Sequence, residues 1–360
     1  MKPKMKILIA VGGTGGHLFP AQQLSELLLK EGDCEIFFAG HKLSQSPFFE
    51  RKGVAFQEIA SAPLKKIGPF LLSALKGFWS SFRLIRRFQP AVVVGFGSFH
   101  SFPVLLAAAF LRKKIVLFEA NCLLGKVNRL FLPVSKKIAL QFPLQKMHFS
   151  KGVFVPLLPW TLKSANQSQT GSRQDARNYF HLDPDLFTFL VFGGSQGAQF
   201  INKTFCETVQ LLKQAGFRFQ IIHLTGKAGE ALYSDSLIPV CVKPFENEMH
   251  LAYAAADMAI CRSGAGTIAE LIRYHTPAIL IPFPFAADDH QKVNGEYLAG
   301  KVGGARLLLQ SDASPEKLAS QILALKSQLK ERKEALQKMS QESEGRSQFA
   351  KIVREVGRGE

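Results

Sequence analysis

The stretch that decides the fold is Ile7-Leu-Ile-Ala-Val-Gly-Gly-Thr-Gly-Gly-His17, an apolar run that passes directly into a glycine-rich turn. A second stretch, Phe189-Leu-Val-Phe-Gly-Gly-Ser-Gln-Gly-Ala198, repeats the pattern later in the chain. Each predicts a buried strand, a tight turn and then an amphipathic helix. Together they predict two Rossmann-like domains facing each other across a cleft, because ligands of parallel sheets bind beyond the carboxyl ends of the strands.

Short apolar runs alternate with helical patterns along the chain, which is typical of parallel α/β proteins. The predicted strands are Lys6–Val11, Glu35–Ala39, Ala91–Gly95 and Ile115–Phe118 in the first half, and Phe187–Phe192, Gln220–Leu224, Val240–Val242, Met258–Cys261 and Ala278–Ile281 in the second. The predicted fold class is therefore α/β.

A polar stretch from Thr161 to Arg177, rich in Ser, Gln, Asn and Thr, separates the two halves. It lacks apolar residues for a core face and is interpreted as a linker or exposed loop. We therefore expect an N-terminal domain of residues 1–160 and a C-terminal domain of residues 161–360. One helical pattern runs from about Pro315 to Met339 and a shorter one ends at Val356, with the option that the last helix packs back on the first domain.

Composition excludes several classes of protein. The 360 residues include 47% apolar residues and carry a formal net charge of +17, so general disorder is excluded and an acidic partner is expected. No apolar run approaches the ~18 residues of a membrane-spanning helix, and no signal-peptide core follows the N-terminal lysines. The five scattered cysteines have neither disulfide nor zinc spacing, which favours the cytosol.

The first glycine turn, Gly12 to His17, is suited to an anion. Its four glycines let the backbone turn tightly and approach a ligand, and the following helix offers free N–H groups. The spacing matches neither the dinucleotide fingerprint nor a Walker loop. A tight turn without a ligand is the alternative, and it accounts less well for four glycines and a histidine at one turn.

Two later segments carry polar groups at the ends of predicted strands. Cys261-Arg-Ser-Gly-Ala-Gly-Thr-Ile-Ala-Glu270 opens a helix whose first N–H groups suit a diphosphate. Glu270 either accepts two ribose hydroxyls or only stabilises the start of the helix. Asp288-Asp-His-Gln-Lys-Val-Asn294 carries groups suited to sugar hydroxyls, and one of its aspartates also suits a helix cap.

The order and spacing of these motifs resemble the MurG family of N-acetylglucosaminyltransferases. The matching segments are Gly-Gly-Thr-Gly-Gly-His from Gly12, Gly-Gly-Ser-Gln-Gly-Ala from Gly193, Arg-Ser-Gly-Ala-x-Thr-x-x-Glu from Arg262 and Asp-His-Gln-x-x-Asn from Asp289. The resemblance covers about residues 6 to 306. It implies the GT-B glycosyltransferase fold, with an acceptor- and membrane-binding N-terminal domain and a C-terminal domain that binds UDP-GlcNAc.

The resemblance also implies the activity. The family transfers GlcNAc with inversion from UDP-GlcNAc to the C4 hydroxyl of the muramoyl sugar of lipid I, which gives lipid II for peptidoglycan. It uses no bound metal or cofactor, and it attaches peripherally to the inner, cytoplasmic face of the plasma membrane. The expected partners are therefore UDP-GlcNAc, lipid I and an anionic membrane surface, and not nucleic acid.

The family's substrate-binding positions carry over to this sequence. Thr14, Gly15 and Gly16 match the turn that approaches donor and acceptor, and Asn121 matches the asparagine of His-Glu-Gln-Asn. Ser195 matches the donor-contacting serine, Gln291 the glutamine on the GlcNAc hydroxyls, and Glu246 the position whose backbone reads uracil. The segment around the diphosphate and ribose comprises Ala265, Gly266, Thr267, Ile268, Ala269 and Glu270.

Several positions depart from the family pattern. Phe118 and Ala120 replace the histidine and glutamine beside Asn121, and Leu158 stands where the family has a donor-binding arginine. In the loop from Gly95 to Pro103, the replacements are Ser98 and Phe102 for glycines and Phe99 for tyrosine. These departures affect expected acceptor contacts more than the donor site.

Two residues are candidates for the general base that removes the proton from the acceptor hydroxyl. His17 offers a neutral imidazole at the first glycine turn, and Glu119 offers a carboxylate near the end of the fourth predicted strand. The residues favour His17 by a modest margin, although it could instead only hydrogen-bond the acceptor or the leaving phosphate. Departure of UDP would be assisted by the amides of residues 263–267.

No metal site is predicted. Asp183-Pro184-Asp185 satisfies the Asp-x-Asp motif of metal-dependent glycosyltransferases. It precedes a predicted strand, however, and therefore belongs to the amino edge of the sheet, and a proline between the two acids suits a turn. No pair of histidines has the spacing of metal ligands.

Three other functions are compatible with parts of the sequence. A different UDP-sugar-dependent lipid glycosyltransferase would share the fold and the donor half. A UDP-GlcNAc 2-epimerase would share the twin domains but needs further acid/base residues. A nucleic-acid-binding protein would account for the positive charge, but neither a recognition helix nor an aromatic stacking motif is found.

The segment from Pro63 to Pro90 predicts a helix that also contacts a membrane surface. Its predicted core-facing stripe is Leu71, Leu75, Phe78, Phe82 and Ile85. The apolar residues left outside the stripe are Phe70, Leu72 and Trp79, and the surrounding cations are Lys65, Lys66, Lys76, Arg83, Arg86 and Arg87. Apolar side chains ringed by cations suit an anionic lipid surface, whereas the alternative is a helix buried in an aromatic core.

Overall fold

The computed structural model describes residues 3–12, 15–50, 53–61, 67–145, 150–158, 172–194, 198–226, 233 and 238–360. The chain forms two compact units. Unit 1 comprises residues 1–162 and 343–360, and unit 2 comprises residues 163–342. The C-terminal domain expected over residues 161–360 therefore differs from unit 2 at its end. Residues 343–360 belong to unit 1, the unit formed by the start of the chain.

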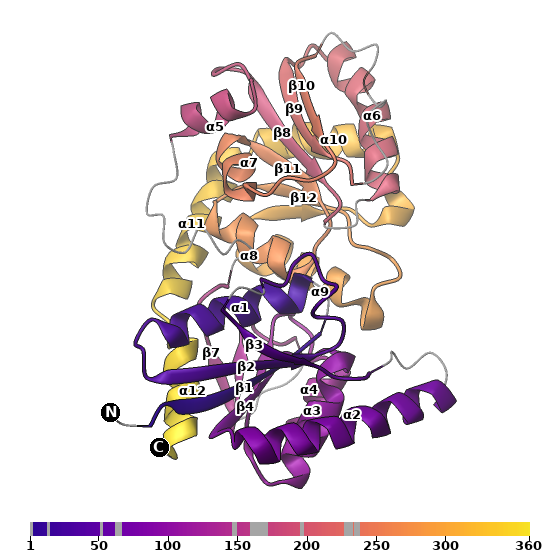
Figure 1. Ribbon diagram of the computed structural model, residues 1–360. Helices are drawn as coiled ribbons and strands as arrows, with labels where there is room; N and C mark the ends of the chain where they lie inside the picture. The colour runs from indigo at the N-terminus through magenta and orange to yellow at the C-terminus, as the bar shows by residue number, and fades with distance from the viewer. Residues whose placement is uncertain are drawn as a thin grey trace. The chain divides into compact units, whose positions relative to one another are not determined.

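Unit 1 is built on a parallel sheet with strand order β3-β2-β1-β4-β5-β6-β7 (Figure 1). Its strands are β1 (Met5–Val11), β2 (Cys34–Gly40), β3 (Ala55–Glu58), β4 (Val92–Gly95), β5 (Lys114–Glu119), β6 (Lys137–Leu140) and β7 (Gly152–Phe154). The central strands are apolar at almost every position, as expected when helices cover both faces of a parallel sheet.

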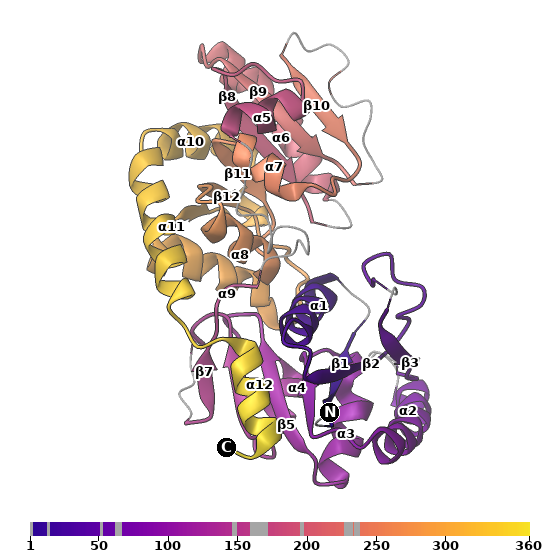
Figure 2. The same ribbon diagram turned by 60° about the vertical axis from the view of Figure 1, so that its left-hand side comes forward.

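Helices cover the two faces of this sheet in two groups. On one face lie α1 (Gly15–Leu29) and α12 (Phe349–Arg358), and on the other lie α2 (Ile67–Phe88), the short turn η1 (Phe99–Ser101), α3 (Phe102–Phe110) and α4 (Lys126–Phe131). Figure 2 shows α12 against the sheet, close to β5. The face that carries α12 is thus built from residues more than 300 positions apart, such as Ile7 and Val353.

The helix α12 is an integral part of unit 1. The Phe349 ring stacks on Phe118 of β5, with centroids 5.3 Å apart and planes inclined by 22°. Arg354 donates to Glu31 Oε1 at 2.8 Å and to the carbonyl of Leu28 at 3.0 Å at the end of α1. The substitution of Phe118 for the family histidine therefore has a packing role, because the ring completes an aromatic cluster with the C-terminal helix.

Unit 2 is built on a second parallel sheet with strand order β10-β9-β8-β11-β12-β13. Its strands are β8 (Phe187–Phe192), β9 (Phe219–Leu224), β10 (Val240–Lys243), β11 (Met258–Cys261), β12 (Ala278–Leu280) and β13 (Ala305–Leu307). Its helices and turns are α5 (Arg173–Tyr179), α6 (Gln199–Gln214), α7 (Met249–Ala255), α8 (Ala265–Arg273), η3 (Ala287–Asp289), α9 (His290–Glu296), η4 (Tyr297–Val302), η5 (Gln310–Asp312), α10 (Pro315–Lys326) and α11 (Leu329–Glu344). The helices α6 and α10 pack on one face of this sheet.

All nine predicted strands are present, with ends that shift by at most one residue. The short strands β3, β6, β7 and β13 were not predicted. Two expectations about helices are wrong. The end of the polar stretch 161–177 is not a loop, because Arg173–Tyr179 forms α5 and buries Ala176 and Arg177. The single helix expected over 315–339 is two helices, which are separated at Ser327–Gln328.

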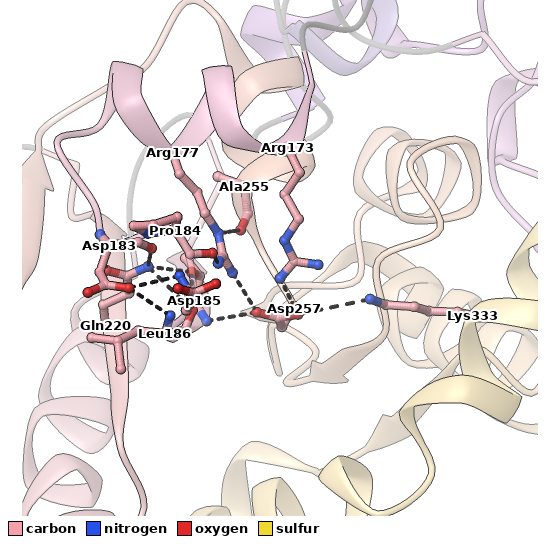
Figure 3. A network of polar contacts seen from close by, with 11 residues as sticks. Arg173, Arg177, Asp183, Pro184, Asp185, Leu186, Gln220, Ala255, Asp257 and Lys333 are labelled. Carbon is pink, nitrogen blue, oxygen red and sulfur yellow. Dashed lines mark hydrogen bonds and ion pairs between the residues drawn. The ribbon is translucent and has the colours of Figure 1, made fainter.

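The burial of Arg177 is explained by an ion-pair network around Asp257, the residue that precedes β11 (Figure 3). Arg177 and Arg173 reach Asp257 from α5, and Lys333 approaches it from α11 at 4.0 Å. Asp257 Oδ2 also accepts a hydrogen bond from the backbone N–H of Thr188 at 2.9 Å. One carboxylate therefore ties two helices to the amino edge of the sheet.

We expect Asp257→Asn to lower the free energy of unfolding by about 3 kcal/mol, because the change leaves the buried Arg177 beside two other cations. The measurement is urea denaturation followed by circular dichroism. The control is Lys203→Ala, which breaks the exposed Lys203–Glu207 pair and should cost less than about 0.5 kcal/mol. A loss for Asp257→Asn as small as that of the control would contradict the role of the network.

Candidate functional site

The carboxyl edge of the unit 1 sheet contains the first glycine turn. Thr14 lies outside the described residues, whereas Gly15 is buried at the start of α1 and Gly16 is exposed. A Cβ added at Gly16 would meet no described atom within 4 Å, so the packing of the chain does not require glycine there. Pro20 lacks the N–H that would bond to the Gly16 carbonyl. The first turn of α1 therefore leaves space and a backbone acceptor for a ligand.

His17 and Glu119 lie at this edge in different surroundings. His17 is half-buried in the first turn of α1. Glu119 is only 4% exposed at the end of β5, and both of its carboxylate oxygens are engaged. Oε1 accepts from the N and Nδ2 of Asn121, both at 3.1 Å, and Oε2 accepts from Gly125 N and Asn128 Nδ2, both at 2.9 Å. The Glu119 carboxylate therefore holds together the loop that follows β5.

Two further departures from the family pattern are structural in this chain. Leu158 is 6% exposed and belongs to the hydrophobic core of unit 1, so the position of the family arginine is here a core residue. Ser98 forms the N-cap of η1 and accepts a hydrogen bond from His100 N at 3.2 Å. At both positions the resemblance implies a residue near the substrate, whereas the side chain present here contacts other residues of the chain.

In unit 2 the strand order reverses between β8 and β11, and both predicted motifs follow these two strands. Gly194 after β8 has a φ of +88°, a conformation that favours glycine, whereas Ser195 lies outside the described residues. After β11, Gly264 is the N-cap of α8, so Ala265, Gly266 and Thr267 present the first N–H groups of the helix. Ligands of parallel α/β sheets bind at such a reversal.

The residues around α8 are joined by Ser263. Ser263 Oγ donates to the carbonyl of Gln291 at 2.7 Å, and Asn294 Nδ2 donates to the carbonyl of Ser263 at 3.2 Å. The side chain of Gln291 in turn accepts from Phe283 N at 3.0 Å. The backbone of Gln291 is therefore held against the start of α8. The motif before α8 and the motif around Gln291 lie together, as they must if both contact one ligand.

The buried side chain of Arg262 links the segment before α8 to the segment that follows β12. It is 8% exposed, and its Nη1 donates to the carbonyls of Ile281 and Pro282, both at 3.0 Å. Burial lowers the pKa of Arg262 to about 10, so the side chain remains charged at neutral pH. A buried cation next to the start of α8 makes this edge of unit 2 favourable for an anion.

Glu270 is buried in the second turn of α8, with 3% of its surface exposed. Its Oε2 accepts a hydrogen bond from the hydroxyl of Tyr253 at 2.8 Å, and the Tyr253 ring stacks on Tyr274 at 5.2 Å. Glu270 is therefore held by a contact within the chain, and the two interpretations, ribose binding and stabilisation of the helix start, remain to be tested. The tyrosine fixes the direction of the carboxylate.

Glu246 is also turned inward. Its Oε2 lies 2.6 Å from Lys243 Nζ, and its Oε1 accepts from Glu248 N at 2.9 Å and from the Tyr179 hydroxyl at 3.3 Å. Although burial acts in the opposite direction for both groups, the contact raises the pKa of Lys243 and lowers the pKa of Glu246. The side chain anchors residues 244–248.

Sequence reasoning missed the residues that support these positions. Tyr253 and Lys243 lie in ordinary apolar runs, and only the fold brings them to Glu270 and Glu246. Arg262 stands next to Ser263 in a quoted motif, but its inward direction has no signal in the sequence. Asp183 precedes β8, and its Oδ1 accepts from Asp185 N at 2.8 Å, as in a turn. Within the described ranges, no cluster of three His, Cys, Asp or Glu side chains is arranged to hold a metal.

Comparison with known proteins identifies the class. Residues 7–140 match the model of the glycosyltransferase family 28 N-terminal domain, and residues 188–356 match the model of the glycosyltransferase family 28 C-terminal domain. Each of the two Rossmann-like units carries a glycine turn at the point where its strand order reverses. The chain is a GT-B glycosyltransferase. The α/β class and the GT-B fold predicted from the sequence are confirmed.

Within this class, the chain belongs to the MurG family. A relative from Protochlamydia amoebophila is 39% identical over 86% of this chain and 85% of its own length. A relative from Chlamydia felis is 34% identical over 96% of this chain and 98% of its own length. Both bear the name UDP-N-acetylglucosamine--N-acetylmuramyl-(pentapeptide) pyrophosphoryl-undecaprenol N-acetylglucosamine transferase. The crystal structure of Acinetobacter baumannii MurG matches with a TM-score of 0.75 and 26% identity, over 98% of this chain and 100% of that one.

Proposed function

We propose that this chain transfers GlcNAc from UDP-GlcNAc to the C4 hydroxyl of the muramoyl sugar of lipid I, with inversion at C1, and so produces lipid II. The observation that carries the proposal is the group of residues at the switch point of unit 2. There the start of α8, the Tyr253-bonded carboxylate of Glu270 and the Ser263-bonded Gln291 are held together in a chain of the MurG family. These groups suit a diphosphate, a ribose and a sugar, in that order.

The test is incubation of the purified chain with labelled UDP-GlcNAc and lipid I, with EDTA present throughout. We expect labelled lipid II even with EDTA present. The reason is that the leaving UDP is proposed to be stabilised by the chain's own N–H groups. Product formation from UDP-GlcNAc alone, or transfer to a different lipid but not to lipid I, would favour the epimerase or the other lipid glycosyltransferases.

In the proposed donor site, Glu270 accepts hydrogen bonds from the ribose hydroxyls. Glu270→Ala should raise KM for UDP-GlcNAc by about tenfold to a hundredfold and change kcat little, because a charge-assisted hydrogen bond contributes ~1.5–3 kcal/mol. Glu270→Gln keeps the side-chain volume if the alanine variant is unstable. As a control, Tyr253→Phe keeps the carboxylate and removes only the contact within the chain. Unchanged kinetics in both Glu270 variants would show that Glu270 is structural.

For the general base we propose His17 rather than Glu119. The four hydrogen bonds that Glu119 accepts occupy both of its oxygens and give the carboxylate a structural role in the loop after β5. His17 lies on the first turn of α1, beside Gly16, where an added Cβ would meet no described atom within 4 Å.

We expect His17→Asn to lower kcat about 10²- to 10⁴-fold while KM for UDP-GlcNAc stays within about threefold, because only proton transfer is removed. Glu119→Gln should chiefly lower the melting temperature, since the amide cannot accept all four hydrogen bonds. Kinetics from pH 6 to 9 and thermal denaturation measure the two effects. The roles are reversed if Glu119→Gln abolishes turnover at unchanged stability and His17→Asn does not.

The membrane contact that we propose is an apolar patch on α2 and α3. None of the helices in the described ranges has the length and hydropathy of a membrane-spanning segment. Leu72, Leu75 and Trp79 on α2 are 59%, 57% and 51% exposed, and Phe110 on α3 is 70% exposed. Leu75, expected in the core stripe, is therefore outside it, because the buried face of α2 turns through Ser81, Leu84 and Ile85.

Cations surround this α2–α3 patch. A groove of about 580 Å³ beside Trp79 is lined by Lys76, Arg83 and Arg87, and Arg86 lies over the Phe82 ring at 5.8 Å. Lys65 and Lys66 lie outside the described residues. A helix buried in an aromatic core would not expose these side chains. Each cation near an anionic bilayer contributes roughly 1 kcal/mol, so several of them with an aromatic side chain are enough for reversible binding.

The triple variant Trp79→Ala, Arg86→Glu, Arg87→Glu should lose most co-sedimentation with anionic vesicles at low salt, and wild-type binding should fall as salt rises. The control is Lys203→Glu, Lys213→Glu on α6, which makes the same change in net charge in unit 2. Equal sedimentation of the folded triple variant and wild type would exclude this patch as the membrane contact.

A further inference from the structure

A series of buried hydrogen bonds in unit 2 has no role in the proposed reaction. His223, near the end of β9, is 0% exposed, and its Nε2 lies 3.0 Å from Asn202 Oδ1 on α6. Its Nδ1 lies 2.8 Å from the hydroxyl of Tyr233. Asn202 Nδ2 donates in turn to the carbonyl of Thr225, just after β9, at 2.9 Å. These four residues are called the His223 network below.

The direction of each hydrogen bond in the His223 network follows from the carbonyl at one end. A carbonyl only accepts, so the amide nitrogen of Asn202 must face Thr225, and the amide oxygen must face His223. Nε2 of His223 therefore carries the proton, and Nδ1 accepts from the Tyr233 hydroxyl. Burial lowers the pKa of His223 to about 4 and raises the pKa of Tyr233, so the ring is neutral and the hydroxyl keeps its proton at pH 7. The Nε2–H tautomer satisfies every one of these contacts, and the Nδ1–H tautomer does not.

The His223 network holds the exit of β9, and the exit of β9 holds the segment that follows β10. Among the described strands, β10 stands at the edge of the sheet and pairs with β9 alone. The pairing continues past both strands, because Gly226, the residue after Thr225, donates its N–H to the carbonyl of Pro244 at 3.0 Å. Pro244 opens the segment 244–248, in which Glu246 matches the position expected to read uracil through its backbone.

The network also holds the start of α6. Asn202 lies in the first turn of α6, and its N–H donates to the carbonyl of Ala198 at 3.0 Å. Ala198 is the last residue of the second glycine-turn motif. The amide side chain of Asn202 therefore joins the helix after this glycine turn to the exit of β9. A shift of either element would leave a buried amide or carbonyl group unpaired, which is unfavourable.

We propose that His223 is a positioning residue for recognition of the donor's nucleobase, and that it acts by holding the Asn202 amide in the one orientation that binds the Thr225 carbonyl. The inference rests on the proposed function, in which the segment 244–248 reads a uracil base. Uracil presents a carbonyl acceptor at the position where cytosine presents an amino donor. Backbone groups distinguish these two bases when their positions are fixed, so the network controls the choice of base and not the transfer step.

Three substitutions separate the two hydrogen bonds of His223. His223→Gln places an amide N–H near the position of Nε2 and keeps the donor to Asn202. His223→Asn places an amide oxygen near the position of Nδ1 and keeps only the acceptor for Tyr233, and His223→Phe keeps neither. In calorimetric titrations of the full chain, the Asn and Phe variants should bind UDP about tenfold more weakly than wild type, and the Gln variant within about twofold of it. Binding of CDP should change in none of them, so the preference for UDP over CDP falls in the first two alone.

A control variant distinguishes positioning from general stability. Val209→Ala changes α6 within the apolar core of unit 2, at a residue outside the His223 network. It should lower the melting temperature and leave the affinities for UDP and CDP within about twofold of wild type. The proposal is overturned if the loss of UDP affinity follows the melting temperature across all four variants, or if the Gln and Asn variants behave alike. If His223→Phe does not fold, the comparison of the Gln and Asn variants decides.

Two further measurements complete the test. The imidazole nitrogen signals of His223 in NMR spectra should show the proton on Nε2, and a proton on Nδ1 would overturn the proposal. In transfer assays, His223→Asn should raise KM for UDP-GlcNAc about tenfold and leave kcat within about twofold, as expected when only donor binding is weakened. A wild-type chain that prefers UDP to CDP but makes no lipid II would refute the proposed function and leave this inference standing. A wild-type chain that makes lipid II without preferring UDP to CDP would overturn this inference alone.

Discussion

Parallel pairing of neighbouring strands is the constraint on which the rest of the structure depends. In both units each described strand runs parallel to its neighbours, so all carboxyl ends meet at one edge and all amino ends at the other. Helices must follow the strands to return the chain, and their first N–H groups therefore collect at the carboxyl edge. The carboxyl edge of unit 1 carries the first glycine turn and His17, and that of unit 2 carries the second glycine turn, α8 and Gln291. The Asp257 network stabilises the amino edge of unit 2.

In unit 2 the candidate site residues lie at one edge of the sheet and the Asp257 network at the other, but the buried carboxylates of the site still need partners within the chain. Glu270 is oriented by Tyr253, and Glu246 is anchored by Lys243. A bare carboxylate at either position would be costly to bury, and the partner makes the burial affordable. The supporting residues come from other elements, which is why the fold has to form before the site does.

The sequence predicted the fold well because its signals are local. Runs such as Lys6–Val11 and Phe187–Phe192 are long and apolar, and glycine turns mark their ends. It missed β7 and β13, which are three residues long and only partly apolar. It also assigned Leu75 to the core, because ideal helical spacing does not reveal which way a helix is rotated against its sheet. Motifs predict the candidate site residues, but Tyr253, which contacts Glu270 from 17 positions earlier in the chain, left no local pattern.

The return of α12 to unit 1 has a consequence for biosynthesis. The core of unit 1 includes Phe349, Ile352 and Val353, so the first strands to leave the ribosome cannot complete their packing until the last of these residues has been made. Unit 2 has all of its own residues by position 342 and is free to fold earlier. Domains usually fold in the order in which they are synthesised. Here the N-terminal unit finishes last, because α1 alone covers one face of its sheet until α12 has been synthesised.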